Sequence, residues 1–266
     1  MRELKQALQK MSAVILDMDG VLYRGSEPIK GAAKAVAFLR NSGKKVIFLT
    51  NNSESSRSSY VKKLASMGIP ASEGEVVTSG QVTADYIKAR DPNARVFAIG
   101  GEGLMQELKR EGLHLVKHEK ATHVVVGIDR SVTYEKLKGG FRALLSGAEF
   151  IATNPDNVYP TEKGLSPGAG AIIGALERSS ARKPNAVMGK PSPYIIQFVL
   201  RILGTRPSET AIIGDQIDTD IKAGSRTGLM TVLVLSGVSK AEDVKRASGT
   251  KNAPDFVIDS LMGVIS

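Results

Sequence analysis

Short runs of apolar residues alternate with longer amphipathic stretches along the whole chain. Runs such as Val14–Leu16, Val46–Leu49 and Ala211–Ile213 contain no polar residue. Strands of this kind are buried on both faces, which is typical of a parallel sheet covered by helices. The predicted strands are Ala13–Leu16, Lys45–Leu49, Glu75–Thr78, Arg95–Ile99, His123–Ile128, Glu149–Ala152, Ala186–Met188, Thr210–Ile213, Thr231–Leu235 and Asp255–Val257.

Amphipathic stretches lie between these strands. Their apolar residues recur every three to four positions, which is the period of a helix with one buried face. Strands and helices that alternate in this way build βαβ units, so the pattern predicts an α/β fold with a mostly parallel sheet. The clearest predicted helices are Ala32–Arg40, Ser55–Met67, Thr133–Leu145, Pro193–Leu203 and Thr219–Thr227.

The composition narrows the class of protein. Of 266 residues, 42% are hydrophobic and 24% are charged, which excludes wholesale disorder and a fibrous repeat. The absence of cysteine excludes a disulfide scaffold, a cysteine-bound zinc site and thiol catalysis. No stretch approaches the roughly 18–20 apolar residues of a membrane span, and the run Ala13–Leu16 is too short for the core of a signal peptide. We therefore expect a soluble, cytoplasmic protein that does not bind membranes.

The charge balance is basic. Lys and Arg number 36 against 27 Asp and Glu, which makes the formal net charge +9. Such a surplus fits either a nucleic-acid partner or an anionic metabolite. Because the basic residues are scattered and not interleaved with aromatic residues, we expect an anionic metabolite as the partner and no nucleic acid.

Two carboxylates follow the first predicted strand, in the segment Asp17-Met18-Asp19-Gly20. Residues two positions apart in an extended chain face the same side. Both carboxylates therefore address one point beyond the carboxyl end of the strand, where open α/β sheets bind ligands. A hard cation such as Mg²⁺ would relieve their mutual repulsion and find its preferred oxygen ligands there. Taken alone, the same residues also fit a polar turn.

Polar side chains follow three later strands as well. Thr50 and Asn51 suit phosphate oxygens, although both residue types are also common helix caps. Lys190 follows a short apolar strand, where its charge suits a phosphoryl group and where a plain surface lysine also fits. Asp215 ends another buried strand, and the further aspartates after it occupy a helix start, which favours acidic residues whatever their function.

These residues stand in a distinctive order: Asp-x-Asp, then Thr-Asn, then Lys, then Gly-Asp with a further Asp. The order resembles that of the haloacid dehalogenase superfamily, and the resemblance covers the full chain. Within that superfamily the sequence is most similar to the NagD-like phosphatases, which are also described as nitrophenyl phosphatases. The segments that carry the resemblance are LDMDGVLYRG, FLTNNS, ATNPD, GKPSP, IIGDQIDTDI and LVLSGVS.

The resemblance implies a role for each catalytic residue. Asp17 would be the nucleophile that forms an aspartyl-phosphate. Asp19 would protonate the leaving alkoxide and then activate the water that hydrolyses the intermediate. Thr50 and Asn51 would bind phosphoryl oxygens, and Lys190 would offset charge on the nucleophile and the phosphate.

The resemblance also implies Mg²⁺ as the cofactor. Asp17, the backbone carbonyl of Asp19 and Asp215 would bind the ion, and Asp220 would support it from outside the coordination sphere. The metal would neutralise charge and orient the phosphate for in-line attack. The family motif is similar to Gly-Asp-x-x-x-Thr-Asp, which leaves Asp218 without a role, so we interpret Asp218 as a surface or capping residue.

The spacing of the motifs locates an inserted domain. Thr50 and Lys190 are 140 residues apart, which is far more than one βαβ return needs. Residues 1–80 and 183–266 are therefore expected to form a Rossmann-like core with a parallel sheet. Residues 81–182 would form a cap, and the resemblance implies that this cap is of the C2 type, an α/β domain. Residues 78–80, together with the junction from Ser179 to Pro184, are candidate hinges.

Two loops of the expected cap look like the end of a strand and the start of a helix. They are Ala152–Asp156 and Ser166–Ala171. The resemblance suggests that both lie near the substrate. Ordinary turn chemistry explains Asn-Pro and Pro-Gly equally well, so neither loop is included among the catalytic residues.

The expected function is Mg²⁺-dependent hydrolysis of a small phosphomonoester, such as a nucleoside monophosphate, a sugar phosphate or 4-nitrophenyl phosphate. A phosphotransferase or mutase of the same superfamily fits the same residues and differs only in the acceptor of the phosphoryl group. A nucleotide-binding protein without catalysis is a further alternative, although binding alone needs no nucleophile. A homodimer is an expectation that rests on the resemblance alone.

Overall fold

The computed structural model describes residues 2–161 and 164–265, and the chain divides into two compact units. The first, which we call the core unit, comprises Met1–Thr50, Val61–Val77 and Lys190–Ser266. The second, the inserted unit, comprises Asn51–Tyr60 and Thr78–Gly189. Each unit has a parallel sheet of its own. This confirms the fold class expected from the sequence, an α/β core that carries an inserted α/β unit.

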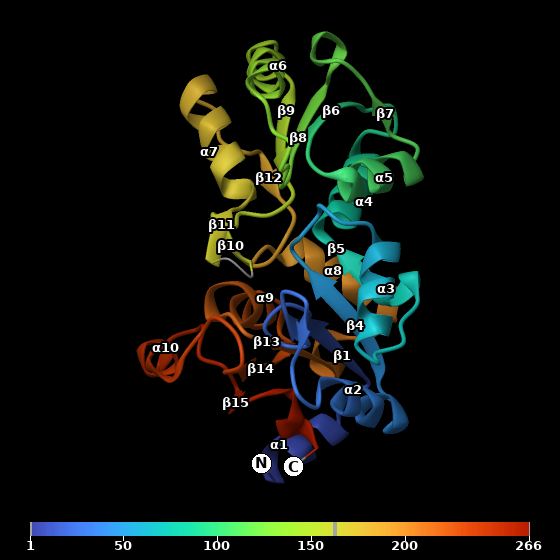
Figure 1. Ribbon diagram of the computed structural model, residues 1–266, viewed down its shortest axis with the longest axis vertical. Helices are drawn as coiled ribbons and strands as arrows, with labels where there is room; N and C mark the ends of the chain where they lie inside the picture. Colours follow the sequence, from blue (N-terminus) through green and yellow to red (C-terminus); the bar gives the residue numbers. More distant parts are fainter. Residues whose placement is uncertain (1, 162–163, 266) are drawn as a thin grey trace. The chain divides into compact units, whose positions relative to one another are not determined.

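The core unit is built on a six-stranded sheet in the order β15-β14-β13-β1-β4-β5 (Figure 1). β1 pairs in parallel with both β13 and β4, and β14 and β15 extend the sheet in parallel. Every residue of β1 and β13 is buried, as expected for strands covered on both faces. The strands are β1 (Ala13–Asp17), β4 (Lys45–Thr50), β5 (Val76–Thr78), β13 (Thr210–Gly214), β14 (Met230–Val234) and β15 (Phe256–Ile258).

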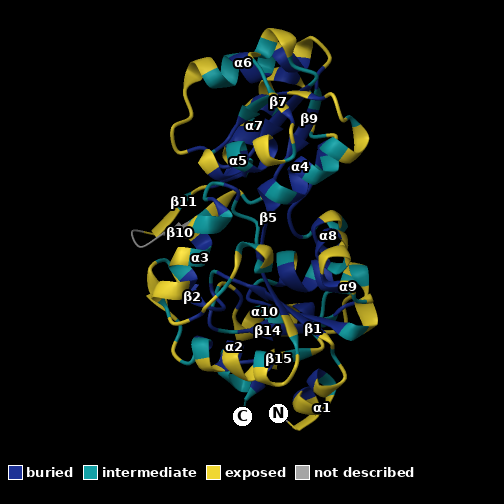
Figure 2. Cartoon of the chain, turned by 90° about the vertical axis from the view of Figure 1, so that its right-hand side faces the viewer, coloured by how far each residue is buried: buried dark blue, intermediate teal, exposed yellow. Residues whose placement is uncertain are grey.

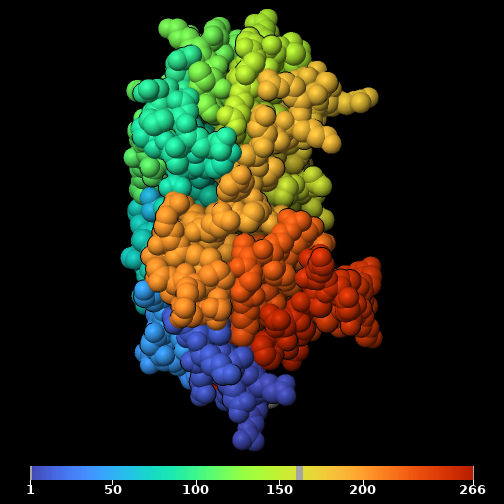
Figure 3. Space-filling model, turned by 180° about the vertical axis from the view of Figure 1, so that it is seen from behind, coloured from blue at the N-terminus to red at the C-terminus, as the bar shows by residue number. Residues whose placement is uncertain are grey.

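Helices connect the strands of this sheet and cover it. α2 packs on β4, α9 packs on β14, and α8 packs against α9. A short hairpin of β2 and β3 follows β1, and α1 lies beside the C-terminal residues (Figures 1 and 3). The elements are α1 (Arg2–Gln9), β2 (Tyr23–Arg24), β3 (Glu27–Pro28), α2 (Ala32–Asn41), α3 (Arg57–Ser66), η1 (Glu73–Glu75), α8 (Pro193–Leu203), η3 (Pro207–Glu209), η4 (Ile217–Ile221), α9 (Lys222–Thr227), α10 (Ala241–Ala247) and η5 (Leu261–Val264).

The inserted unit holds a five-stranded parallel sheet in the order β12-β9-β8-β6-β7. α6 packs against α7 over buried residues that include Val124, Phe150 and Leu176, and α4 packs against α5. Figure 2 shows buried strands beneath helices with exposed outer faces. The elements are α4 (Ser79–Arg90), β6 (Arg95–Ile99), α5 (Glu102–Arg110), β7 (His114–Leu115), η2 (His118–Lys120), β8 (His123–Val126), α6 (Tyr134–Leu145), β9 (Glu149–Ala152), β10 (Val158–Thr161), β11 (Gly164–Pro167), α7 (Ala169–Ser180) and β12 (Ala186–Val187).

One predicted helix needs correction, although β6, β9 and α8 have the predicted bounds. The helix expected over Thr219–Thr227 is a turn of π-helix, η4, that continues into α9. The candidate hinge at residues 78–80 directly follows the division between the units after Val77 and coincides with the start of α4. There the hydroxyl of Thr78 accepts a hydrogen bond from the backbone N–H of Gln81 at 3.2 Å, which caps the helix.

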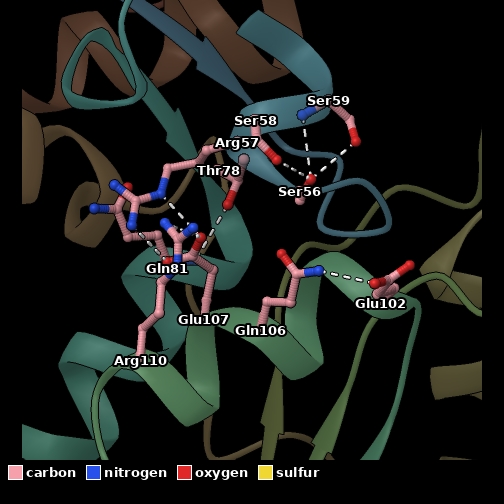
Figure 4. Close-up of polar contacts among 10 residues, drawn as sticks. All are labelled: Ser56, Arg57, Ser58, Ser59, Thr78, Gln81, Glu102, Gln106, Glu107 and Arg110. Atoms are coloured by element: carbon pink, nitrogen blue, oxygen red, sulfur yellow. Dashed lines mark hydrogen bonds and ion pairs between the residues drawn. The ribbon is translucent and has the colours of Figure 1, made fainter. Parts of the chain in front are cut away.

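Residues 51–60 belong to the inserted unit, whereas the sequence placed them in the core. Arg57 donates two hydrogen bonds to the buried Glu107 of α5, from Nε to Oε1 at 2.9 Å and from Nη2 to Oε2 at 3.1 Å (Figure 4). The backbone N–H of Gly103 donates to the carbonyl of Glu54 at 2.7 Å. These bonds tie the segment to α5. The other divisions fall after Val77 and Gly189 rather than after residues 80 and 182.

The helices in the described parts of the chain are short. The longest of them, α4, α6 and α7, have 12 residues each, whereas a membrane-spanning helix needs about 20. None of the described helices has the length and apolar character that crossing a bilayer requires.

Candidate active site

Asp17 is the last residue of the central strand β1. In the register of the sheet, Leu16 lies beside Ile213 of β13, and Asp17 lies beside Leu49 of β4. The carboxyl ends of these three strands therefore meet at one edge of the sheet. Asp17 is 8% exposed. Burial raises its pKa well above the ordinary value, although the nearby Lys190 acts in the opposite direction.

Lys190 lies between two carboxylates. Its Nζ is 2.5 Å from Oδ1 of Asp17 and 2.5 Å from Oδ1 of Asp220, and the residue is only 2% exposed. Burial acts to lower the pKa of Lys190, but the charges of Asp17 and Asp220 outweigh it and raise that pKa. The ammonium is therefore held in its charged form at the end of β1. The surface position that the sequence also allowed is wrong.

Asp215 follows β13, and backbone atoms of other segments lie close to its carboxylate. The backbone N–H of Val238 donates to its Oδ2 at 2.6 Å. A Cβ at Gly20, where φ is +80°, or at Gly237 would overlap the Asp215 carboxylate, so only glycine fits at these two positions. Burial, followed by the charge of Asp220, raises the pKa of Asp215 to about 7.

Asp220 is brought to the same place by the π-helical turn η4. Its Oδ2 accepts a hydrogen bond from the backbone N–H of Gln216 at 3.1 Å, and the residue is 1% exposed. A Cβ at Gly214 would overlap the Asp220 side chain, which explains the glycine at the end of β13. Asp218 is exposed, as expected for a surface residue.

Carboxylate oxygens of Asp17, Asp215 and Asp220 lie within 4.8 Å of one another. Oδ1 of Asp215 is buried and has no hydrogen-bond partner among the described residues. Three carboxylates share the single positive charge of Lys190, so the cluster carries an excess of negative charge. A hard divalent cation such as Mg²⁺ prefers oxygen ligands and would offset that charge. The donor set therefore fits Mg²⁺.

Asp19 is half-buried, two residues beyond Asp17. Burial raises the pKa of its carboxyl, and the charge of Lys63 acts in the opposite direction. Lys63 lies on α3 with its Nζ 3.6 Å from the centroid of the Tyr23 ring, and Tyr23 forms a β-bridge with Asp19. Sequence reasoning missed Lys63, because one lysine on an amphipathic helix carries no signal that separates it from its neighbours.

Thr50 and Asn51 lie at the junction of the two units. Thr50 is the half-buried last residue of β4, and Asn51 is the first residue of the inserted unit. Nδ2 of Asn51 donates a hydrogen bond to Oδ2 of Asp156 at 3.0 Å. The structure thus gathers three of the predicted residues, Asp17, Asp215 and Asp220, around Lys190. Asp19 is close by in the chain, and Asn51 has a partner that was not predicted.

Two protein-family models match this chain. Residues 14–114 match the family model of haloacid dehalogenase-like hydrolases, and residues 187–264 match a second model described as HAD-hydrolase-like. An acid sugar phosphatase of Staphylococcus epidermidis is 42% identical over 238 residues, which are 90% of this chain and 92% of that protein. The chain belongs to the haloacid dehalogenase-like hydrolases.

Solved structures of this family have the same fold. A p-nitrophenyl phosphatase from Archaeoglobus fulgidus superposes with a TM-score of 0.89 at 41% identity, over 94% of this chain and 97% of that one. A 4-nitrophenylphosphatase from Thermotoga maritima superposes with a TM-score of 0.90 at 36% identity, over 96% of each chain. Together with the staphylococcal relative, they identify this haloacid dehalogenase-like hydrolase as a NagD-type phosphatase that acts on phosphoric monoesters.

Proposed function

We propose that this phosphatase hydrolyses small phosphomonoesters with Mg²⁺ through an aspartyl-phosphate on Asp17. The observation that carries the proposal is the cluster of Asp17, Asp215 and Asp220 around the ammonium of Lys190. The orphaned Oδ1 of Asp215 suits a metal ligand, and Asp17, Asp215 and the backbone carbonyl of Asp19 would hold the ion. When bound, Mg²⁺ would neutralise charge on the phosphoryl group and align it with the nucleophile.

The chain's own residues would carry both chemical steps. In the first, a carboxylate oxygen of Asp17 attacks phosphorus while the bond from phosphorus to the leaving oxygen breaks, and Asp19 gives that oxygen a proton. In the second, the ionised Asp19 takes a proton from water. The resulting hydroxide attacks phosphorus, and the bond to Asp17 breaks to release phosphate. The raised pKa of Asp19 favours the protonated form that the first step needs.

The remaining predicted residues would bind the phosphoryl group. Lys190 would offset the negative charge that Asp17 and the phosphate bring together. Thr50 and Asn51, at the carboxyl end of β4, would donate hydrogen bonds to phosphoryl oxygens. Asp220, which shares Lys190 with Asp17, would keep the ammonium in place.

The substrate class that we propose is a small phosphorylated metabolite, with sugar phosphates first. The staphylococcal relative is named an acid sugar phosphatase, and the relatives of solved structure are named for the artificial substrate nitrophenyl phosphate. The basic charge of the chain, +9, suits anionic substrates in general.

The test is phosphate release from a panel of sugar phosphates, nucleoside monophosphates and 4-nitrophenyl phosphate, with Mg²⁺ or with EDTA. The wild-type protein should turn over several members only with the metal. Asp17→Asn should reduce turnover below detection, because an amide is neither a nucleophile nor an anionic metal ligand. Full activity of Asp17→Asn, or equal activity in EDTA, would show the mechanism to be wrong.

A further inference from the structure

The side chain of Asn51 is held by a carboxylate of the inserted unit. Oδ2 of Asp156 accepts one hydrogen bond from Nδ2 of Asn51 at 3.0 Å and another from Nδ2 of Asn154 at 2.9 Å. Hydrogen bonds to an ionised acceptor are stronger than neutral ones. The bond fixes the direction in which the amide nitrogen of Asn51 points.

The loop that carries Asp156 is fixed in turn by a buried polar chain. The hydroxyl of Thr153 donates to Oδ1 of Asn154 at 2.7 Å, and the hydroxyl of Ser53 donates to Thr153 at 3.2 Å. Ser53, Thr153 and Asn154 are at most 5% exposed. Buried networks whose members are all hydrogen-bonded hold their side chains rigidly.

Backbone atoms confine the same loop from two sides. The backbone N–H of Gly170, in the first turn of α7, donates to the carbonyl of Asp156 at 2.9 Å. A Cβ at Gly189 would come within 2.7 Å of Oδ1 of Asn51 and 2.9 Å of Cβ of Asn154. The amide of Asn51 therefore has a carboxylate beside its nitrogen and a glycine backbone beside its oxygen.

We propose that Asp156 is a positioning residue that holds the side chain of Asn51 in the orientation that binds the substrate phosphate. This inference rests on the proposed function, in which Asn51 binds a phosphoryl oxygen. Asp156 itself is not a phosphate ligand, because a carboxylate and a phosphate repel each other. It acts through the amide, whose second N–H stays oriented while the first is bound to Asp156.

The test is a double-mutant cycle of Asn51→Ala, Asp156→Ala and the pair together, with kcat, KM and the inhibition constant of inorganic phosphate measured for each. Asp156→Ala should weaken phosphate binding about tenfold, as expected when a charged hydrogen-bond partner is removed. In the Asn51→Ala background, Asp156→Ala should have no further effect, because the amide through which Asp156 acts is absent. Asp156→Asn should lose less, since its one oxygen still accepts from the amide.

The matched control is Glu149→Ala. Glu149 is the first residue of β9 and lies at the opposite end of that strand from the Thr153–Asp156 loop. Phosphate binding and turnover by the Glu149→Ala variant should therefore match the wild type. Additive losses in the double mutant would overturn the inference, as would wild-type phosphate binding by Asn51→Ala or by both Asp156 variants. Those results would leave Mg²⁺-dependent turnover by the wild-type protein intact, whereas failure of the proposed function would abolish turnover in the wild type itself.

Discussion

At the scale of single residues, the site holds more carboxylates than cationic groups. Among the described residues, Lys190 is the one cation that pairs with both Asp17 and Asp220, and Asp215 adds a third buried carboxylate. Three like charges in one buried site favour either protonation or a bound cation. The pKa values of Asp17 and Asp215 are both raised, so protonation of these groups is favoured when no cation is bound.

This balance predicts how the stability of the metal-free protein depends on pH. The pKa of Asp215 rises from an ordinary 3.8 to about 7 on folding, so between these values the folded protein binds more protons than the unfolded chain. The free energy of unfolding should therefore fall as pH rises through this window. In thermal unfolding with EDTA, Asp215→Asn should weaken the fall, and Mg²⁺ should reverse it for the wild type. An identical pH slope in Asp215→Asn would contradict the prediction.

The two roles of Asp19 can be separated by the choice of substrate. Nitrophenolate leaves without a proton, so Asp19→Asn should still form the aspartyl-phosphate from 4-nitrophenyl phosphate. Hydrolysis of that intermediate should slow by about 10²–10⁴-fold, because the general base is gone. Stopped-flow absorbance should show a burst of roughly one nitrophenolate per enzyme, followed by slow turnover. With a sugar phosphate, release of the sugar should show no such burst. Slow release of nitrophenolate from 4-nitrophenyl phosphate without a burst would argue against these roles.

At the scale of elements, short connections decide where the functional side chains point. The turn η4 places Asp220 against Gly214, where a side chain would overlap it. Helix α3 crosses the division between the units, because its first residues up to Tyr60 belong to the inserted unit and the rest to the core. The pair of Arg57 and Glu107 holds that first turn to α5, as Figure 4 shows.

Breaking this pair should loosen the segment that follows Thr50. The side chain of Glu107 is 2% exposed and that of Arg57 is 15% exposed. Arg57→Met would therefore leave a buried carboxylate whose other ion pair among the described residues is with Arg110, 3.8 Å away. We expect a loss of about 3–5 kcal/mol in the free energy of unfolding, measured by urea denaturation. The double variant Arg57→Met with Glu107→Leu should recover part of it. Equal stability of Arg57→Met and the wild type would refute this role.

At the scale of the whole molecule, the residues proposed to bind the metal and the residues of the polar loop belong to different units. Every carboxylate proposed to bind the metal belongs to the core unit, and so does Lys190. The polar loop of Thr153–Asp156 belongs to the inserted unit, together with Asn51. Four peptide bonds mark the division, and two of them directly adjoin predicted site residues, Thr50 and Lys190.

This division predicts where Mg²⁺ stabilises the protein. A ligand that binds the folded state protects the structure that holds it. Hydrogen exchange with and without Mg²⁺ should therefore show slower exchange in β1, β13 and η4, and little change in β8 and β9. Asp215→Asn, as a control, should show a much smaller difference. Equal protection of both sheets would contradict the assignment of the metal to the core unit.

Much of the fold was predictable because the strands are almost continuously apolar. The apolar runs Val14–Leu16 and Ala211–Ile213 by themselves predict strands buried in a parallel sheet, and both runs are buried there. Boundaries were predicted less well where local chemistry is ambiguous. Thr78, Ser79 and Gly80 fit a hinge as well as a helix start, and the structure places the start of α4 directly after the division at Val77.

The sequence by itself determined the catalytic candidates, because parallel strands bring their carboxyl ends to one edge and polar residues follow those ends. Asp17, Thr50 and Asp215 were found in this way. Only the tertiary structure decided that Lys190, 173 residues from Asp17, lies between two carboxylates. It alone showed that Asp156 holds Asn51, 105 residues away. The physical reason is that hydrophobic periodicity is local, whereas a buried charge finds its partner only after the chain has folded.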